Sequence, residues 1–489
     1  MKVEKRFIAF MSLTAAVSFL AYLNAAAYPF VFNTISLIQE NEALKTLKNI
    51  PSFFTEPAPF FSPLAMAAFA VDYSMWGMNS IGFRITNIIL HALTSVLVGL
   101  FLLYFLNRRG AVFSALIFAL HPAHTEAVTG IAGRGEILAA IFTLVSFALF
   151  LKQESKWLYA ASLFAFLLAL LSSKTTLALP ILLAVYSLYF IDKKSVIRTI
   201  PYFIFSALYL LLYISLNRGS YLEDISIYSH ILSSLKVFGI YIRLILFPVG
   251  LNAWHDFPVP AKLLSFDIVF PLQMFLILTL CLIALYSYSK RISFALLFIL
   301  LTLLPSLHII PQMMLMKEAY LYLPLIGFSL LIGVLFEKGG EKSIKLAGSI
   351  FLLPIVIFSV IILQRNAVWK DNFTILRDAA AKSPDSAILH YNMGVVYDDN
   401  GLFNEAVKEY ETAIKLNRRM VDAYYNIACV YSKQGNIEGG FKALKWATAY
   451  GFRDINKLLT DPDLERLRHE TEFSDIIESI KKGDIHGHK

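Results

Sequence analysis

The stretch from Leu120 to Glu136, L-H-P-A-H-T-E-A-V-T-G-I-A-G-R-G-E, concentrates residues that can do chemistry. It contains two histidines, two glutamates and an arginine, in a chain whose neighbouring segments are mostly aliphatic and aromatic. Ionisable groups at membrane depth are costly unless they face a cavity or find partners. We therefore expect this stretch to serve a functional site.

Metal binding is one chemistry that this stretch offers. His121, His124 and Glu126 carry the ligand types of a divalent metal site. The H-P-A-H-T-E spacing includes Pro122, however, and does not place all three side chains on one helical face. A divalent metal is therefore one interpretation, and structural hydrogen bonding or contact with a substrate is the other.

Phosphate binding is a second chemistry. Arg134 lies between Gly133 and Gly135. A guanidinium makes bidentate contacts with phosphate oxygens, and glycine permits close approach of the backbone. The alternative is an ion pair of Arg134 with Glu126 or Glu136.

Composition places this stretch in a membrane protein. The chain has 489 residues, of which 57% are hydrophobic and only 16% charged, so we expect a polytopic membrane protein. Cys281 and Cys429 provide neither a disulfide framework nor metal-ligand spacing. The net charge of +8 arises from short basic links between apolar runs, and no basic face with interleaved aromatics predicts a nucleic-acid partner.

The elements that must position the polar stretch are membrane spans. A first helix is expected from Phe7 to about Tyr28, with the N-terminus inside. The segment Ile240–Leu251 is apolar enough to span but contains Arg243 and Pro248, and we interpret it as interfacial or re-entrant. The expected total is then about 11 spans, the others lying at about 81–106, 111–120, 137–151, 157–171, 177–191, 198–216, 268–288, 292–307, 319–336 and 345–364.

Alternating these spans places several polar segments on the outer face. They are the loops 29–80, 121–136, 217–267 and 305–318, with the short link 172–176 beside them. We expect a cavity at the outer mouth of the bundle to collect these segments.

The C-terminal part repeats itself. Tyr391-Asn392 recurs as Tyr425-Asn426, and Gly401 recurs as Gly435, at the period of tetratricopeptide repeats. Each such repeat is a helical hairpin that stacks on the next one. We predict a transmembrane domain over 1–364 and a repeat domain over 365–489, with repeats at about 386–419 and 420–453 and a helical cap at 454–482.

These features together resemble a known family. The body of about 11 helices, the stretch described first, and three further motifs are similar to the transmembrane and tetratricopeptide-repeat O-mannosyltransferases. The motifs are S-K-T-T-L-A-L-P at Ser173–Pro180, E-A-Y-L-Y-L-P-L-I-G-F at Glu318–Phe328 and R-N-A-V-W-K-D at Arg365–Asp371. The resemblance implies an all-α chain, with a GT-C-type membrane bundle followed by a soluble α-solenoid. It also implies transfer of a sugar from a polyprenyl-phosphate lipid to a hydroxyl on the external face.

The chain departs from the family at charged positions. Asn33 and Thr34 stand where the family carries an acidic pair just after the first helix, whereas Asn41 is retained. An amide cannot accept the proton that a general base must take. Charge is also lost at Ser62, Thr175 and Ala319, where the family carries arginine, glutamate and arginine.

The resemblance implies roles for the residues that remain. Glu126 is the expected general base, with Glu40 as the fallback. The expected ligands of the donor phosphate are Arg134, Lys174 and His124, and the expected lining of the cavity comprises His121, Glu136, Asn33, Asn41, Glu318, Tyr320 and Tyr322.

Three functions remain open at this point. The first is a glycosyltransferase in a bacterial inner membrane, with its repeats outside the cytoplasm binding an acceptor or partner protein. The second is a degenerate, non-catalytic scaffold whose repeats hold envelope proteins. A transporter is the third, although no paired inverted repeat of broken helices is evident.

Overall fold

The computed structural model describes residues 5–56, 62–152, 155–216, 226–257, 260, 262–307, 316–342 and 344–482. These described residues form helices, turns and loops without a strand. The chain divides into two compact units, Met1–Ala253 with Val259–Asp371, and Trp254–Pro258 with Asn372–Lys489. The predicted all-α fold is thus confirmed.

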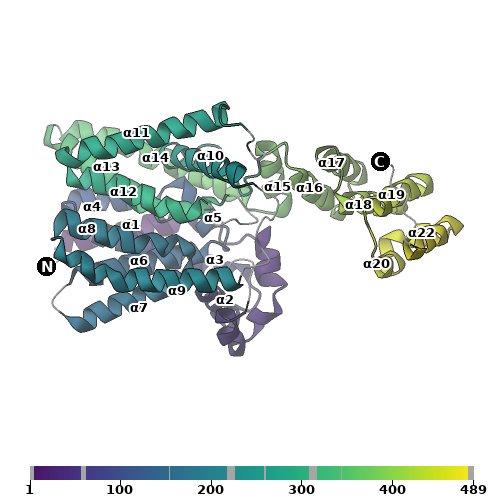
Figure 1. The fold of residues 1–489 in the computed structure, drawn as a ribbon, viewed down its shortest axis with the longest axis horizontal. Coiled ribbons are helices and arrows are strands. Elements are labelled where there is room, and N and C mark those ends of the chain that lie inside the picture. The colour runs from purple at the N-terminus through teal and green to yellow at the C-terminus, as the bar shows by residue number, and fades with distance from the viewer. Residues whose placement is uncertain are drawn as a thin grey trace. The chain divides into compact units, whose positions relative to one another are not determined.

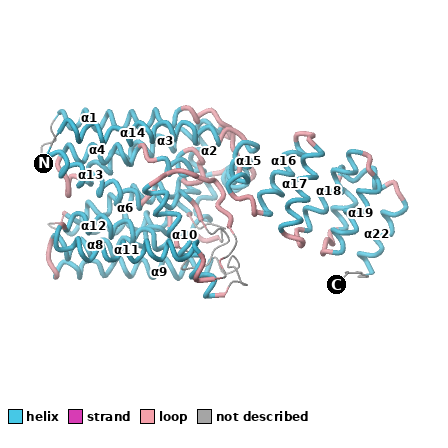
Figure 2. Tube along the Cα trace, turned by 90° about the horizontal axis from the view of Figure 1, so that it is seen from above, coloured by secondary structure: helices cyan, strands magenta, loops and turns pink. Residues whose placement is uncertain are grey.

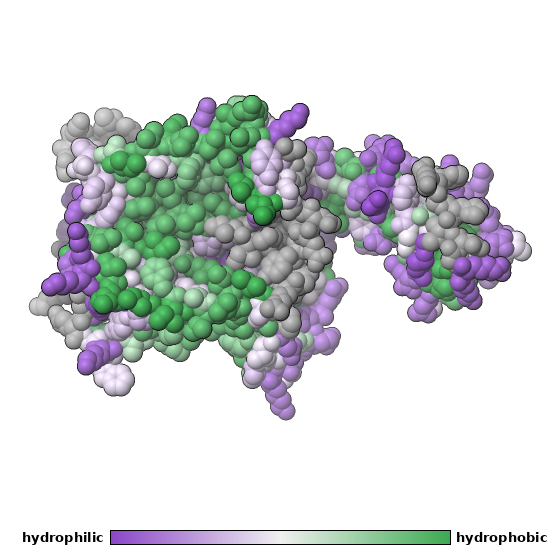
Figure 3. Space-filling view, viewed as in Figure 1, coloured by the Kyte–Doolittle hydropathy of each residue, from purple (hydrophilic) through white to green (hydrophobic). Residues whose placement is uncertain are grey.

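The first unit is a bundle of long apolar helices (Figure 1). Exposed apolar side chains cover the outside of α9 and α11, which gives this unit a broad hydrophobic surface (Figure 3). A surface of this kind suits lipid contact rather than water. The helices of the unit are α1 (Lys5–Leu23), α2 (Pro63–Trp76), α3 (Ser80–Leu102), α4 (Arg108–Ala119), α5 (Thr125–Val128), α6 (Arg134–Leu151), α7 (Lys156–Ser172), α8 (Leu179–Phe190), α9 (Ile200–Leu216), α10 (Ile227–Leu246), α11 (Phe266–Tyr288), α12 (Lys290–Leu303), α13 (Pro324–Lys342) and α14 (Ile344–Val368).

Six described helices are long and apolar enough to cross a membrane, or up to eight spans if each sharply bent pair of helices counts as one. Two shorter apolar helical segments, Lys156–Ser172 and Lys174–Phe190, accompany them. The unit therefore has the character of a multi-pass membrane domain, and the expected total of 11 stays a prediction.

Helix α10 differs from the expectation for its region. It is continuous through Arg243 and is among the six candidate spans. The helix ends before Pro248, because the residue preceding a proline is disfavoured in helical conformation. Arg243 therefore does not interrupt the helix, and the interfacial or re-entrant placement of this segment stays a prediction.

The polar stretch begins where α4 ends. Pro122 cannot continue the helix, and the His121 side chain accepts a hydrogen bond from the Ala123 amide at the start of a 3₁₀ turn. The chain then forms α5 and turns at Ile131, which has φ of 55°, before α6 starts. Figures 1 and 2 place α2 and α10 at the end of the bundle opposite the N-terminus, and Figure 1 shows α5 at the same end.

The second unit contains the predicted repeats. Its two helical hairpins are α16 (Ala387–Asp399) with α17 (Phe403–Leu416), and α18 (Val421–Gln434) with α19 (Ile437–Ala449). They follow α15 (Asn372–Lys382) and precede a cap of α20 (Ile455–Thr460), α21 (Glu465–Arg468) and α22 (Thr471–Lys482). The main part of this unit begins at Asn372, whereas the sequence predicts the repeat domain from 365.

The repeated residues have repeated roles. Gly401 and Gly435 both adopt positive φ, 72° and 77°, just after the first helix of each hairpin. Glycine ends a helix in this conformation without the steric cost that a Cβ atom adds. Asn426 joins the two hairpins, because its amide donates to the hydroxyls of Tyr391 and Tyr410.

Candidate active site

A cavity of about 410 Å³ lies within the first unit. Its described walls come from the predicted loops 29–80, 121–136 and 305–318 and from the link 172–176, together with Tyr213, Ala319, Tyr320 and Trp369. Segments that are far apart in the sequence thus meet at one place, as expected for a mouth at one end of the bundle. The outward orientation of this mouth stays a prediction.

Two carboxylates line this cavity. One Glu126 oxygen accepts a hydrogen bond from the Ala319 amide at 3.0 Å. Both Glu136 oxygens accept hydrogen bonds from hydroxyls, from Ser173 at 2.6 Å and from Thr175 at 2.8 Å. Thr175 stands where the family carries a glutamate, and in this chain its hydroxyl donates a hydrogen bond to the carboxylate of Glu136. Side chains thus hold Glu136, whereas backbone amides of Glu318 and Ala319 hold Glu126.

Two lysines line the cavity with them. Lys174 starts the turn that follows α7, and its ammonium lies 5.2 Å from the centre of the Tyr320 ring. Lys317 directly precedes the E-A-Y-L-Y motif and was not among the predicted site residues. Burial lowers the pKa of Lys317, and the charges of Glu126 and Glu136 oppose that shift. In the sequence, only the position of Lys317 next to the E-A-Y-L-Y motif could have indicated that it belongs to the site.

Arg134 does not line the cavity. Its guanidinium forms a 2.5 Å ion pair with Asp72, and both side chains are almost fully buried. It also donates to the Asn87 side chain at 2.7 Å and to the Phe83 carbonyl at 2.9 Å. The sequence suggested either phosphate binding or an ion pair with Glu126 or Glu136. The structure shows an ion pair, but its partner is Asp72. The guanidinium joins α6 to α2 and α3 behind the wall of the cavity.

The two histidines are core residues. His121 is fully buried and donates from Nε2 to the Ile245 carbonyl at 3.1 Å, which fixes the neutral tautomer when Nδ1 accepts from Ala123. His124 is also fully buried, with its ring 4.5 Å from the rings of Phe118 and Tyr322. Neither lines the cavity. The expected contacts of His124 with phosphate and of His121 with substrate therefore disagree with their positions.

The remaining predicted residues divide in the same way. Asn33, Asn41 and Tyr320 line the cavity. Glu40 is exposed and does not line it, because it lies on the solvent side of the turn before Asn41. The buried Glu318 accepts from the Asn252 amide, and Tyr322 shares a 2.7 Å hydrogen bond with His91, so these two stabilise the surrounding fold.

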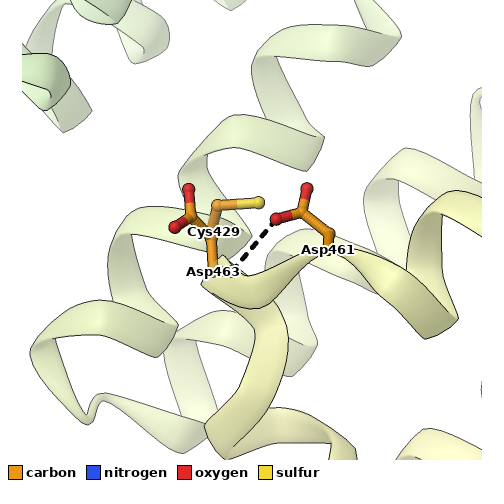
Figure 4. Close-up of side chains that lie close together, drawn as sticks. All are labelled: Cys429, Asp461 and Asp463. Carbon is orange, nitrogen blue, oxygen red and sulfur yellow. Dashed lines mark hydrogen bonds between the residues drawn. The ribbon is translucent and has the colours of Figure 1, made fainter.

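A divalent metal in the cavity stays a prediction. Within the described residues, the one group of three or more such side chains lies in the repeat unit and comprises Cys429, Asp461 and Asp463 (Figure 4). Asp461 accepts a hydrogen bond from the Tyr425 hydroxyl, and Asp463 pairs with Lys433. Burial raises the pKa of the Cys429 thiol, which keeps it protonated at neutral pH. Protein partners thus satisfy this group as part of the packing of the cap.

Comparison with known proteins agrees with both units. Residues 399–435 match the family model of the TPR repeat. The chain is 23% identical to protein O-mannosyl-transferase TMTC3 of Mus musculus over 87% of this chain and 53% of the relative. Against TMTC3 of Homo sapiens the identity is 23%, over 86% and 53%, and against protein O-mannosyl-transferase F38B6.6 of Caenorhabditis elegans it is 24%, over 82% and 62%.

Most of this chain is similar to proteins named O-mannosyl-transferases. The resemblance predicted from the motifs is therefore confirmed, as is the tetratricopeptide repeat. The chain spans about half the length of the two TMTC3 relatives that it matches.

Proposed function

We propose that this chain is a membrane O-glycosyltransferase, which transfers a sugar, by analogy with its relatives mannose, from a polyprenyl-phosphate lipid to a hydroxyl of a protein or glycan. The observation that carries this proposal is the cavity in which Glu126 and Glu136 lie with Lys174 and Lys317. Carboxylates supply the base that a hydroxyl needs, and ammonium groups stabilise a departing phosphate.

The chemistry is a direct displacement at the anomeric carbon. Glu126 removes the proton of the acceptor hydroxyl while its oxygen forms the new bond to that carbon. The bond from the anomeric carbon to the phosphate oxygen breaks, and the oxygen leaves with the electron pair. Lys174 and Lys317 stabilise the charge on this leaving group. Glu136 holds its place through Ser173 and Thr175 and completes the electrostatic environment.

We also propose the orientation. Basic links between apolar helices mark the cytoplasmic side, and the cavity lies in segments that alternate with them. The N-terminus is then cytoplasmic, and the cavity and the repeats face outward, as in a bacterial inner membrane. Stacked helical hairpins make a concave surface suited to peptides, so the repeats would present an acceptor or hold a partner protein.

Transfer in membranes tests the proposal. Membranes that carry the chain are supplied with polyprenyl-phosphate mannose labelled in the sugar, and label bound to protein is measured. We expect Glu126→Gln to lower the rate by about 10²–10⁴-fold, the usual contribution of a general base. Glu42→Gln is the matched control, since that carboxylate is exposed and pairs with Lys45. An unchanged rate in the Glu126 variant would refute the mechanism.

A non-catalytic scaffold is the second candidate. It is favoured by Asn33, which lines the cavity at the position where the resembling family carries an acid. A scaffold would bind the lipid without consuming it, and its repeats would retain a partner protein. Binding of the labelled lipid with no transfer to any acceptor would support this candidate.

A further inference from the structure

Two residues in the cavity wall carry buried polar atoms without a hydrogen-bond partner in the described part of the chain. They are Oδ1 of Asn33 and Nε1 of Trp369. A buried polar atom that stays unpaired costs about 1–3 kcal/mol, so nearly all such atoms have partners in folded proteins. A ligand in the cavity could supply the partners that the described protein groups do not.

The Trp369 ring is held firmly in this position. Only 2% of the residue is exposed, and its amide donates to the Asn366 carbonyl at 3.0 Å. Asn366 is itself fixed by hydrogen bonds with Thr129 and Asn24. The far edge of the indole packs on Gly130, where a Cβ atom would lie 2.7 Å from the ring. These contacts therefore fix the position of the indole ring, and with it the position of the unpaired N–H.

Asn33 is also fixed by its neighbours. Phe32 before it adopts φ of 57°, a conformation that costs a residue with a side chain on the order of 1–3 kcal/mol. Thr34 after it is fully buried, and its hydroxyl both donates to the Val31 carbonyl and accepts from the Val31 amide. The chain thus holds Asn33 at the cavity although the backbone beside it is strained.

The chemistry of the two groups identifies the part of the ligand that they suit. The indole N–H only donates, whereas an amide both accepts and donates, and neither carries a charge. A phosphate is matched instead by Lys174 and Lys317. Sugar hydroxyls donate and accept at the same oxygen, and aromatic rings suit the apolar face of a sugar. We propose that Asn33 and Trp369 form a hydroxyl-binding subsite that recognises the sugar ring of the donor lipid.

This inference rests on the proposed function for the nature of the ligand. It assigns Asn33 a different task from the acid that the resembling family carries there, namely contact with the sugar in place of proton transfer. Trp369 is assigned a part in selecting the sugar.

Equilibrium binding to the purified full chain in lipid nanodiscs tests the subsite. The probes are polyprenyl-phosphate mannose and the same polyprenyl phosphate without the sugar. We expect Trp369→Phe and Asn33→Ala to weaken binding of the mannosyl lipid about threefold to tenfold, as for one buried hydrogen bond, and to leave the sugar-free lipid unchanged. Trp157→Phe is the control, as that side chain is 86% exposed.

Deoxygenated donors make the test specific for hydrogen bonding. One monodeoxy mannosyl lipid should bind more weakly than the parent to the wild type but no more weakly to Trp369→Phe, because the missing hydroxyl and the missing N–H belong to one interaction. Equal losses for both lipids, or no loss in either variant, would overturn the inference and leave the proposed function standing. Failure of the wild type to bind either lipid would overturn both.

Discussion

The buried ion pair of Arg134 and Asp72 gives a prediction that separates structure from catalysis. A role in donor binding requires Arg134 to reach the cavity, whereas its guanidinium lies behind the wall, 2.5 Å from the carboxylate. The two side chains are 0% and 2% exposed. Removing one partner of such a pair leaves an unpaired buried charge, which costs about 3–5 kcal/mol. We therefore expect Arg134→Ala and Asp72→Ala to be destabilising to a similar degree.

The double variant decides between the two roles. With both charges removed, no unpaired charge stays buried, and we expect Arg134→Met with Asp72→Leu to be more stable than either alanine variant. Thermal unfolding of the detergent-purified chain measures this. Asp267→Asn is the control, because Asp267 is 60% exposed and exposed pairs contribute about 0–1 kcal/mol.

The refuting result is equally definite. If Arg134 bound the donor phosphate, Arg134→Ala would abolish transfer at unchanged thermal stability, and Asp72→Ala would not reproduce its effect. That combination would contradict the position of the guanidinium as a structural tie between α6 and α2. Recovery of stability in the double variant would confirm it.

Two further predictions concern the repeat unit. Gly435→Ala should destabilise this unit by about 1–2 kcal/mol in chemical denaturation of the full chain, because its φ of 77° is a left-handed conformation and the added Cβ would meet Arg466. Burial raises the pKa of the Asp398 carboxyl and the charge of Lys433 opposes that shift, so Lys433→Met should raise this pKa further. A carboxyl whose pKa is raised in the folded state makes the folded protein less stable as the pH rises. Thermal melts between pH 4.5 and 7 should therefore show a larger loss of stability in the variant than in the wild type.

Local patterns in the sequence predict the repeat unit well. The tetratricopeptide period depends on residues close together in the chain, such as Gly401 and Gly435, so spacing alone indicates the hairpins. Glu126, Lys174 and Tyr320 were also predicted for the cavity, and they do line it. Their motifs lie in turns between helices, where polar residues in an apolar bundle are conspicuous.

Contacts distant in sequence explain what was missed. Arg134 looked available for a ligand because its partner, Asp72, lies on α2 in the segment predicted as an external loop, and no sequence signal links the two residues. Glu40 is next to the lining residue Asn41, yet the turn directs it to solvent. Trp369 follows the last apolar helix, where no local pattern reveals that its ring reaches a cavity wall.

Under the proposed function, other groups of the lining would compensate for the charges that this chain lacks. Relative to the resembling family, acids are missing at Asn33, Thr34 and Thr175 and arginines at Ser62 and Ala319. Both acidic and basic side chains are thus missing, and the described lining has two carboxylates and two ammonium groups. One of these ammonium groups belongs to Lys317, two residues before Ala319, where the arginine is missing.

The four charged groups of the lining suit the ligand of the proposed function. Ionisable side chains in an enclosed, largely apolar cavity cost stability unless a partner offsets their desolvation. Under the proposed function, the lipid phosphate would lie near Lys174 and Lys317, which both line the cavity. The same cavity also leaves an uncharged donor and acceptor unpaired. Charged groups for a phosphate beside neutral groups for hydroxyls are the arrangement that a sugar phosphate requires.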